Sequence, residues 1–501
     1  MVAVQCEGAY AMNTVIHTGQ TVKKQHNFWN GLHFHPTDAI EDDWGKKILD
    51  TVAEDNVADM IRMYAMLDDI VTQDAQGNLQ YDFTQNDIRL DYMLSKGFRI
   101  FLSYNFMPAC IAKDPSLVTK GRYKGKTICS SIPKDYSLWE DVCYAYTQHL
   151  VERYGKETVS SWYLQCWNEP DLGAFFMRGV PTSHNDPEAL ALRLREYCKL
   201  YKHFAAGVVK ACDTAKIGGP SLDNDLLFLD GFLRTVHDQG IQIDFVGIHP
   251  YGKLSPVHAE NNLRVHEANQ SIIDRYFPEI EIIADEYGIC GGGFSGILNN
   301  PRLAIRDGSE FAAYFGKMVH AYIHSDARLT KMLICLSGQH QTTQEFMGYR
   351  NMISLNLVKK PIYNAYLLLR KLKENILAVD ADTDDLTVLP TADDKGQLSV
   401  MLAYASEHFD TTLPSLSHAL TFDGSIGKHA VRIWRIDDNH TNPLRFAQAN
   451  GIGHTPSEEE LVLLRREGTI KPYAEFTWDF SENNTFTVEM DNNALILIEI
   501  A

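Results

Sequence analysis

Eight short apolar runs alternate with longer amphipathic segments between residues 26 and 375. Short runs rich in β-branched and aromatic residues predict buried strands, and apolar residues at three- and four-residue spacing predict helices. Repeated strand–helix units form parallel strands, and eight such units close into a barrel. We therefore predict an α/β fold, a (β/α)8 TIM barrel, with strands at 28–34, 60–66, 99–105, 160–167, 215–219, 245–249, 280–284 and 331–336.

The pattern changes after about residue 376, where short alternating runs are separated by Asp, Gly and Asn. Such runs predict a β-rich accessory domain, similar to a β-sandwich. A Ser-x-x-Glu capping box from Ser457 to Glu460 predicts a short helical insert within it. Residues 1–25 are too polar for a barrel strand and are expected to add an edge strand to the accessory sheet. The predicted organisation is an N-terminal segment at 1–25, a barrel at 26–375 and the accessory domain at 376–501.

The composition restricts the classes of partner. A net charge of −19, from 46 basic and 65 acidic residues, disfavours a nucleic-acid backbone or an anionic membrane surface. The nine cysteines include no Cys-x-x-Cys pair and are odd in number, which predicts reduced, mostly buried thiols. The chain starts without a basic and then apolar leader, and no apolar stretch approaches 18 residues. We expect a cytoplasmic protein that binds neither nucleic acid nor membranes.

Two glutamates lie at the ends of predicted barrel strands. The fourth strand runs into Asn168-Glu169-Pro170, and the proline, which lacks an N–H, ends the ladder there. The seventh strand ends at Glu286. Barrel enzymes build their sites at the carboxyl ends of the strands, so these two carboxyl groups are expected at one mouth. A pair about 5–5.5 Å apart serves a retaining glycosidase, with Glu169 protonated as the acid and Glu286 ionised as the nucleophile.

Other polar residues follow the same strand ends. Asn168 is placed to bond a sugar hydroxyl, with a plain turn residue as the alternative. His249 and Tyr251 follow the sixth strand and are expected to bind sugar or support the nucleophile. On the second strand, Arg62 is a candidate to hold the nucleophile and Tyr64 to hold a hydroxyl. A buried ion pair inside the barrel is an equal alternative for Arg62.

Aromatic side chains near strand ends are candidates for the faces of a sugar ring. Trp29 and Tyr287 are the two that we include in the predicted site, although either can instead belong to the core. Phe106, Phe175 and Phe176 are further candidates with the same alternative.

Taken in order along the chain, these motifs resemble glycoside hydrolase family 39, whose best-known members are β-xylosidases and α-L-iduronidases. The likeness runs along nearly the whole chain and is densest from Trp139 to Leu172. It is carried by Phe28-Trp29, Arg62-Met63-Tyr64, Tyr104-Asn105-Phe106-Met107-Pro108, Trp167-Asn168-Glu169-Pro170, Gly218-Gly219-Pro220, His249-x-Tyr251, Lys360-Pro361 and Arg435-Ile436-Asp437. The resemblance implies a barrel with a β-sandwich accessory domain, Glu169 as the acid/base and Glu286 as the nucleophile.

The departures from the family pattern concern the sugar. Tyr64 stands where the family typically has a histidine, and Asp171 where xylosidases often have asparagine. The aromatic eighth-strand tip of xylosidases is replaced by the segment 336–341, in which Gln339 is expected to face the sugar. A uronic acid would need a cation, for which Arg178 and Lys253 are the obvious candidates, with solvated loop residues as the favoured alternative.

The resemblance favours a retaining, exo-acting β-xylosidase that cleaves terminal bonds of plant-type oligosaccharides. An α-L-arabinofuranosidase, an α-L-iduronidase and a β-glucosidase-like enzyme are alternatives with the same mechanism. We expect a glycoside or oligosaccharide as the partner, no cofactor and no metal, and a homo-oligomer is possible.

A metal-dependent amidohydrolase is the alternative from a different class. His33 and His35 flank Phe34 at the end of the first strand, and His249 lies downstream. Two imidazoles one residue apart face the same side of a strand and suit a metal ion. The segment 331–341 lacks the acid that such a site needs on its eighth strand.

Overall fold

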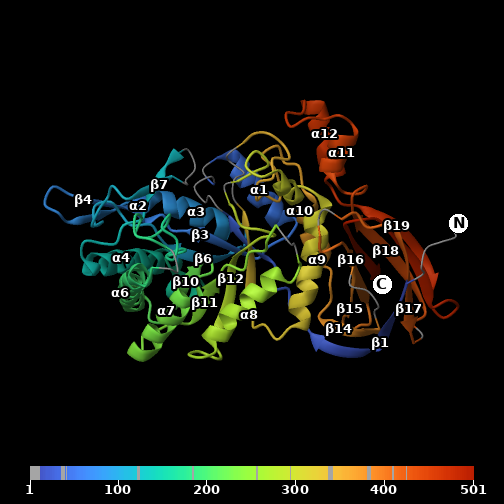
Figure 1. The fold of residues 1–501 in the computed structure, drawn as a ribbon, viewed down its shortest axis with the longest axis horizontal. Coiled ribbons are helices and arrows are strands. Elements are labelled where there is room, and N and C mark those ends of the chain that lie inside the picture. Colours follow the sequence, from blue (N-terminus) through green and yellow to red (C-terminus); the bar gives the residue numbers. More distant parts are fainter. Residues whose placement is uncertain are drawn as a thin grey trace.

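The computed structural model describes residues 12–34, 40, 42–120, 125–182, 186–254, 258–293, 295–336, 342–380, 385–408, 411–424 and 426–501. Eight parallel strands close into a barrel, as predicted, and a second sheet lies beside it (Figure 1). In chain order the barrel strands are β2 Gly31–Phe34, β3 Met60–Tyr64, β6 Arg99–Tyr104, β9 Tyr163–Cys166, β10 Lys216–Leu222, β11 Phe245–Ile248, β12 Glu281–Tyr287 and β13 Lys331–Leu336.

Helices cover the outside of the barrel (Figure 1). Three of them begin at an aspartate whose side chain accepts a backbone N–H, which satisfies a donor that a helix end leaves open. The helices are α1 Asp43–Glu54, α2 Leu67–Ile70, α3 Thr84–Ser95, α4 Tyr136–Tyr154, α5 Lys156–Ser160, α6 Pro187–Ala211, α7 Leu226–Gln239, α8 Asn261–Ile273, α9 Ser309–His324 and α10 Pro361–Leu369, with a 3-10 helix at Pro301–Arg306.

Two small hairpins leave the barrel in the loops after β3 and β6. They are β4 Val71–Gln73 with β5 Leu79–Tyr81, and β7 Val118–Lys120 with β8 Thr127–Cys129. The second hairpin brings Thr119 and Lys120 to the barrel mouth.

The fourth strand starts later than predicted. Residues 160–167 were expected to be extended, but Ser160 is the last residue of α5 and β9 begins at Tyr163. Trp167 and Glu169 both have positive φ, 67° and 44°, so the chain turns sharply as it leaves β9. Such backbone is uncommon outside glycine and concentrates at functional sites.

The seventh strand is longer than predicted and irregular at its end. β12 continues to Tyr287, and its register against β13 shifts between Ala284 and Tyr287. A shift of this kind re-aims side chains, so that neighbours in sequence no longer alternate strictly between the two faces. Asp285 and Glu286 consequently both contact Arg62 inside the barrel.

The accessory sheet has nine strands, and the N-terminal strand β1, Met12–Lys24, is one of them. β1 lies between β14 and β17, so the expectation of an edge strand is wrong. The other strands are β14 Asn375–Asp380, β15 Leu386–Ala392, β16 Leu398–Tyr404, β17 Leu416–Asp423, β18 Lys428–Ile436, β19 Pro472–Asp479, β20 Thr485–Met490 and β21 Ala494–Ile500.

The accessory region encloses an apolar core of its own and carries two short helices. Strands from both halves of the sheet contribute to that core, for example Phe422 and Phe486 together with Val400 and Ile498. The helices are α11 Pro443–Ala449 and α12 Glu458–Glu467, and α12 begins with the predicted capping box. Helix α9 packs on β16 and β21 and joins this region to the barrel (Figure 1).

Six apolar side chains fill the lower part of the barrel and form the floor beneath its mouth: Met60, Phe101, Tyr163, Phe245, Ile283 and Leu333.

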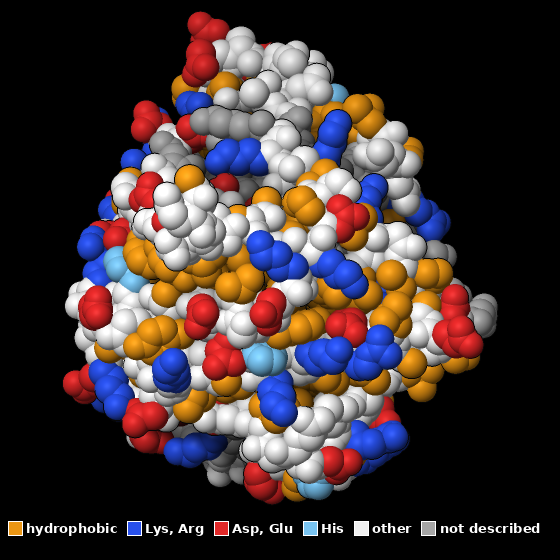
Figure 2. All heavy atoms as spheres, turned by 90° about the vertical axis from the view of Figure 1, so that its left-hand side faces the viewer, with side chains coloured by type: hydrophobic (Ala, Val, Ile, Leu, Met, Phe, Trp, Pro, Cys, Tyr) orange, Lys and Arg blue, Asp and Glu red, His pale blue; other side chains and the backbone are white. Residues whose placement is uncertain are grey.

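The eight cysteines in the described residues are all free thiols, and six of them are buried. No helix in the described part of the chain is both long and apolar enough to span a bilayer. On the face shown in Figure 2, acidic and basic side chains are interspersed.

Candidate active site

A pocket of about 300 Å³ opens at the carboxyl ends of the barrel strands. Its size is at the lower end of the range for small-molecule sites, about 300–1,000 Å³. The pocket is lined by five of the residues predicted for the site: Tyr64, Asn168, Glu169, Tyr251 and Glu286. Other lining residues are Thr119, Lys120, Phe175, Gly291, Gly292, Gly293, Cys335 and Arg350.

Arg62 lies beneath this pocket and is completely buried. Its guanidinium donates to Oε1 of Glu286 at 2.6 Å and to Oδ1 of Asn168 at 2.7 Å. It also donates to Gln165 at 3.1 Å, and its Nε lies 3.1 Å from Oδ2 of Asp285. A guanidinium suits this task because its donors are fixed in a planar fork. Arg62 therefore positions groups of the site from below, consistent with both alternatives considered for it.

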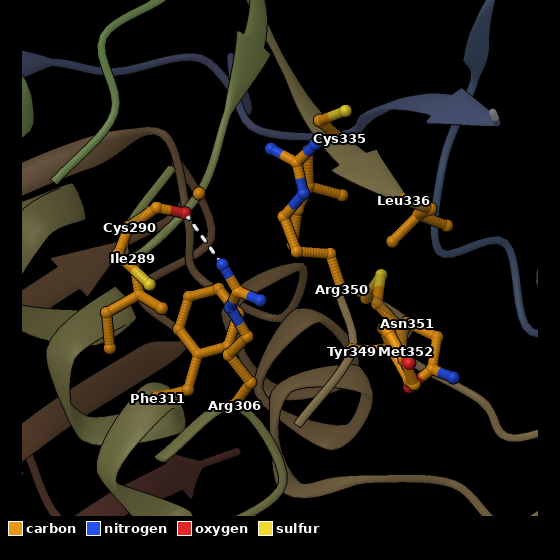
Figure 3. A pocket seen from close by; sticks show the side chains of 12 residues that line it. Ile289, Cys290, Arg306, Phe311, Cys335, Leu336, Tyr349, Arg350, Asn351 and Met352 are labelled. Atoms are coloured by element: carbon orange, nitrogen blue, oxygen red, sulfur yellow. Dashed lines mark hydrogen bonds between the residues drawn. The ribbon is translucent and has the colours of Figure 1, made fainter. Parts of the chain in front are cut away.

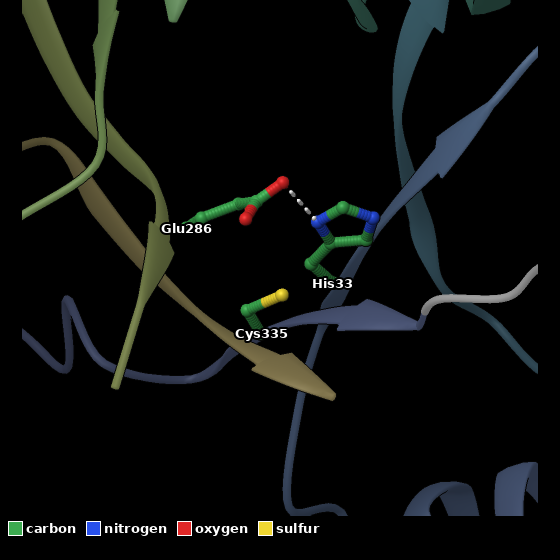
Figure 4. A group of neighbouring side chains, drawn as sticks. All are labelled: His33, Glu286 and Cys335. Atoms are coloured by element: carbon green, nitrogen blue, oxygen red, sulfur yellow. Dashed lines mark ion pairs between the residues drawn. The ribbon is translucent and has the colours of Figure 1, made fainter. Parts of the chain in front are cut away.

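The Glu286 carboxylate is surrounded by donors. Besides Arg62, the Tyr251 hydroxyl donates to Oε2 at 2.7 Å, and the Tyr64 hydroxyl lies 3.4 Å from Oε1. Nδ1 of His33 lies 3.0 Å from Oε1, and the Cys335 thiol lies close to both side chains (Figure 4). Burial acts to raise the pKa of Glu286, but the charges of His249 and Arg62 and the contact with His33 hold it well below the usual range. Glu286 is thus kept ionised.

Glu169 has the opposite character. Its backbone N–H donates to the Ser221 carbonyl at 3.0 Å, and its Oε1 lies 2.8 Å from Nδ1 of His249. Burial raises the pKa of Glu169 to about 7, although His249 acts against that rise. Oxygens of Glu169 and Glu286 lie within 4.8 Å of each other. One protonated and one ionised carboxyl group therefore face the same pocket.

The two histidines of the site differ in charge. Burial lowers the pKa of His33 to about 4, and Arg62 acts in the same direction, so His33 is neutral. His249 is equally buried, but Glu286, Asp285 and Glu169 outweigh that burial and raise its pKa well above the usual value. His249 is thus a buried imidazolium among carboxyl groups.

Two of the predicted aromatic residues lie elsewhere. Trp29 precedes β2, at the amino end of the barrel, where it is 1% exposed and packs edge-on against Phe28. Tyr287 points out of the barrel, where its ring stacks with Phe315 of α9 and its hydroxyl bonds that of Tyr366. Both belong to the core, so neither contacts the pocket. Gln339 lies outside the described residues.

The predicted candidates for binding an acid group also lie outside the pocket lining. The exposed Arg178 donates a hydrogen bond to the Thr119 hydroxyl, and Lys253 is also exposed. The arginine that does line the pocket is Arg350, which stacks over the Tyr251 ring at 4.9 Å. It comes from the long loop between β13 and α10, away from any strand end, so no sequence pattern indicated it. Figure 3 shows Arg350 reaching toward Cys335.

Arg306 holds the backbone of the glycine-rich wall of the pocket, and Figure 3 shows its hydrogen bond to the Cys290 carbonyl. It is 2% exposed and donates to the backbone carbonyls of Cys290, Gly291, Gly292, Ser295 and Gly348. The Gly-Gly-Gly run after Glu286 is visible in the sequence and could have indicated this wall. The arginine that holds it had no comparable signal.

The predicted metal ligands are only partly described. Nδ1 of His33 lies 2.7 Å from Nη1 of Arg62, and His35 lies outside the described residues. Groups with spacing suited to a metal within the described chain are His33-Glu286-Cys335 and Glu169-His249-Glu286 at this site, and Asp437-His440-Asp491 in the accessory region. None of them combines His33 with His249.

Comparison with known proteins identifies the family. Residues 12–485 match the model for glycosyl hydrolases family 39. A β-xylosidase of Caldicellulosiruptor saccharolyticus is 23% identical over 505 residues, which cover 96% of each chain. The human α-L-iduronidase is 22% identical over 212 residues, 39% of this chain and 28% of that protein.

Solved structures agree in fold. A monomeric β-xylosidase from Caulobacter crescentus CB15 superposes with a TM-score of 0.82 at 20% identity, over 98% of this chain and 99% of that chain. The family model spans nearly all of the described residues, including both strands that carry the two buried glutamates. The chain belongs to glycoside hydrolase family 39 and is a glycosidase.

Proposed function

We propose that this glycosidase retains anomeric configuration, with Glu286 as the nucleophile and Glu169 as the acid/base. The observation that carries the proposal is the pair of buried carboxyl groups in opposite protonation states, with oxygens within 4.8 Å. Retaining glycosidases have carboxyl groups about 5–5.5 Å apart, whereas inverting ones need about 6.5–9.5 Å to admit a water. The short separation supports retention. The metal-dependent amidohydrolase alternative is set aside, because the family is one of glycosidases.

The reaction follows from the two environments. Protonated Glu169 gives its proton to the glycosidic oxygen while ionised Glu286 attacks the anomeric carbon. The C–O bond to the leaving group breaks as the bond to Glu286 forms. Glu169, now a carboxylate, then takes a proton from a water that attacks the same carbon and releases Glu286.

The substrate that we propose is a terminal xyloside of a plant-type oligosaccharide, cleaved in the exo mode. The small pocket supports exo action, because a longer chain would need an extended groove. The aromatic rings of Tyr64, Phe175 and Tyr251 line it and suit the apolar faces of a sugar. The names of two relatives, one of them matched over 96% of its length, support xylose as the first choice. α-L-Arabinofuranosides and β-glucosides are alternatives with the same chemistry.

Nitrophenyl glycosides of xylose, arabinofuranose, glucose, galactose and iduronic acid provide the test. We expect the highest kcat/KM on the β-xyloside and loss of turnover in Glu286→Gln. The exposed Glu458, at the start of α12, provides the control, so Glu458→Gln should match the parent. Parent-like turnover by Glu286→Gln would overturn the roles, and preference for another glycoside would overturn the choice of sugar.

A second candidate is an anionic sugar, and Arg350 is the observation that favours it. This half-buried arginine lines the pocket together with the exposed Lys120. Arginine is suited to bind a carboxylate through two parallel hydrogen bonds. If the substrate is a uronide, Arg350→Met should reduce kcat/KM on the iduronide far more than on the xyloside. An equal loss on both glycosides would reject this candidate.

A further inference from the structure

Asp285 is a buried acid next to the site. The double-displacement reaction gives it no role. It is 0% exposed and follows Ala284 at the irregular end of β12. Its Oδ2 lies 3.1 Å from Nε of Arg62 and 3.5 Å from Nε2 of His249. Within the described residues neither of its carboxylate oxygens accepts a hydrogen bond of good geometry. A buried carboxylate without such bonds is expensive unless its charge is balanced by cations.

The barrel makes room for this carboxylate. A Cβ on Gly247 of β11 would lie 2.6 Å from Oδ1 of Asp285 and 2.1 Å from Oγ of Ser221. Only glycine at this position leaves Asp285 space to turn inward. The same Ser221 accepts the backbone N–H of Glu169 through its carbonyl, so Asp285 lies close to the segment that carries the acid/base.

His249 connects the two acids. Its Nδ1 lies 2.8 Å from Oε1 of Glu169 and its Nε2 lies 3.5 Å from Oδ2 of Asp285. The imidazole thus stands between two carboxyl groups on opposite sides of the ring. The charged and titratable groups around it are Glu169 after β9, Asp285 and Glu286 of β12, His33 of β2 and Tyr251 after β11, while Arg62 of β3 shares Asp285 with it.

The ion pairs beneath the pocket favour a proton on each nitrogen of His249, because Asp285 and Glu169 face opposite sides of its ring. With Glu169 protonated and His33 neutral, the carboxyl groups that pair with Arg62 and His249 in this layer are Glu286 and Asp285. Arg62 compensates one of them, and the His249 imidazolium compensates the other. Without Asp285 the buried imidazolium would lose its partner at Nε2, and the neutral ring would be favoured.

We propose that Asp285 is a positioning residue that keeps His249 doubly protonated, so that Nδ1–H of the imidazole stays directed at Glu169 through both steps of the reaction. The inference rests on the roles proposed for Glu169 and Glu286. Nδ1–H occupies one oxygen of Glu169, and the acidic proton of Glu169 is therefore carried by the other oxygen. After that proton is transferred, the imidazolium stabilises the Glu169 carboxylate until it recovers a proton from water.

Replacement of Asp285 by asparagine should reverse this arrangement. The neutral His249 would keep its proton on Nε2, facing the amide oxygen, and would turn a lone pair toward Glu169. The Glu169 proton would then be drawn to Nδ1 and away from the leaving group. Ionisation of Glu169 would also become harder, because the cation beside it is lost.

The experiment compares Asp285→Asn with the parent enzyme on phenyl and 2,4-dinitrophenyl β-xylosides across pH. We expect the apparent pKa of the alkaline limb of the kcat/KM profile to rise by about one pH unit. We also expect the phenyl substrate, which needs acid assistance, to lose about tenfold more activity than the dinitrophenyl substrate, a part of the usual 10²–10⁴-fold effect of general acid catalysis. If Asp285 merely pairs with Arg62, Asp285→Asn should lower the activity on both substrates equally and leave the apparent pKa of the alkaline limb unchanged.

Two further variants keep the test decisive. Gly247→Ala should displace the Asp285 carboxylate and cause the same change in pH profile without removing its charge. In His249→Gln, the added change Asp285→Asn should have little further effect, because Asp285 acts through the imidazole. Additive losses in the double variant would overturn the proposal.

Asp437→Asn, at a buried carboxylate of the accessory region, controls for the loss of a buried charge and should keep the parent pH profile.

Failure of this inference is distinguishable from failure of the proposed function. If Glu169→Gln and Glu286→Gln retain parent activity on the same substrates, the proposed roles are wrong. If those variants lose activity while Asp285→Asn leaves the basic limb and the leaving-group dependence unchanged, only the role of Asp285 is rejected.

Discussion

The Tyr251 hydroxyl donates a hydrogen bond of 2.7 Å to Oε2 of Glu286, while Arg62 occupies Oε1 of the same carboxylate from below. The two donors come from different strands and approach different oxygens. Oε1 is held by an arginine beneath the pocket, and Oε2 is held by a residue that lines the pocket. In the reaction proposed above, the bond from Tyr251 is therefore exchanged or lengthened when Oε2 attacks the sugar.

Tyr251→Phe tests this bond. A hydrogen bond to a charged group contributes about 1.5–3 kcal/mol, which corresponds to about 10- to 100-fold in rate. We expect a loss of this size in kcat/KM on an activated glycoside, with little change in the unfolding midpoint. Tyr276→Phe removes an equivalent bond to Asp230 on the outer helices and should leave the kinetics unchanged. Equal kinetics of Tyr251→Phe and the parent would contradict the assignment.

Arg62 is expected to be essential for stability as well as activity. Arg62→Met would leave the buried carboxylates of Glu286 and Asp285 without their shared cation, and breaking a buried pair costs about 3–5 kcal/mol. The free energy of unfolding, measured in urea, checks this expectation. Arg153→Met removes a partly exposed pair with Asp91 and should cost no more than about 1 kcal/mol. Similar losses in the two variants would show that the buried cation has no special role.

With the roles proposed for Glu169 and Glu286, the pH dependence of kcat/KM follows from these two groups. Burial raises the pKa of Glu169 to about 7, so the protonated acid is lost, and activity falls, as pH rises through 7. The pKa of Glu286 is held well below its usual range, so the nucleophile stays ionised and the acidic limb lies below that range. In Glu169→Gln, the basic limb should vanish on a dinitrophenyl glycoside. A basic limb that persists in this variant would belong to another group.

Arg306 should affect binding more than chemistry. Its hydrogen bonds to five backbone carbonyls hold the Gly291–Gly293 wall, and none of them reaches either glutamate. Arg306→Lys is expected to raise KM several-fold, by about 1–2 kcal/mol of lost hydrogen bonding, with a smaller change in kcat. Arg302→Lys, on the same 3-10 helix, provides the matched control. A fall in kcat without a rise in KM would contradict this role.

The strand ends could be predicted because their positions follow from the barrel itself. Once eight strand–helix units are recognised, residues after β9, β11 and β12 must meet at one mouth, and Glu169, His249 and Glu286 do meet there. Trp29 was misplaced because the strand starts two residues after it, which puts Trp29 at the opposite end of the barrel. Tyr287 was misplaced because side chains alternate along a strand, and its neighbour Glu286 faces inward.

Other features required the three-dimensional structure. Arg350 and Arg306 reach the pocket and its wall from segments between barrel strands and helices, where no periodic pattern predicts direction. The inward turn of Asp285 depends on the register shift in β12 and on the missing Cβ of Gly247. Both are packing relationships between strands that lie far apart in the sequence.

The configuration of azide-rescued products tests the central claim most directly. Glu286→Ala and Glu169→Ala are each incubated with an activated aryl glycoside and azide, and the glycosyl azides are examined by proton NMR. Azide replaces the nucleophile in the first variant, so one displacement should give inverted configuration. In the second, azide attacks the glycosyl-enzyme, so two displacements should give retained configuration. The opposite pattern, or rescue of neither variant with parent-like hydrolysis in both, would contradict the account.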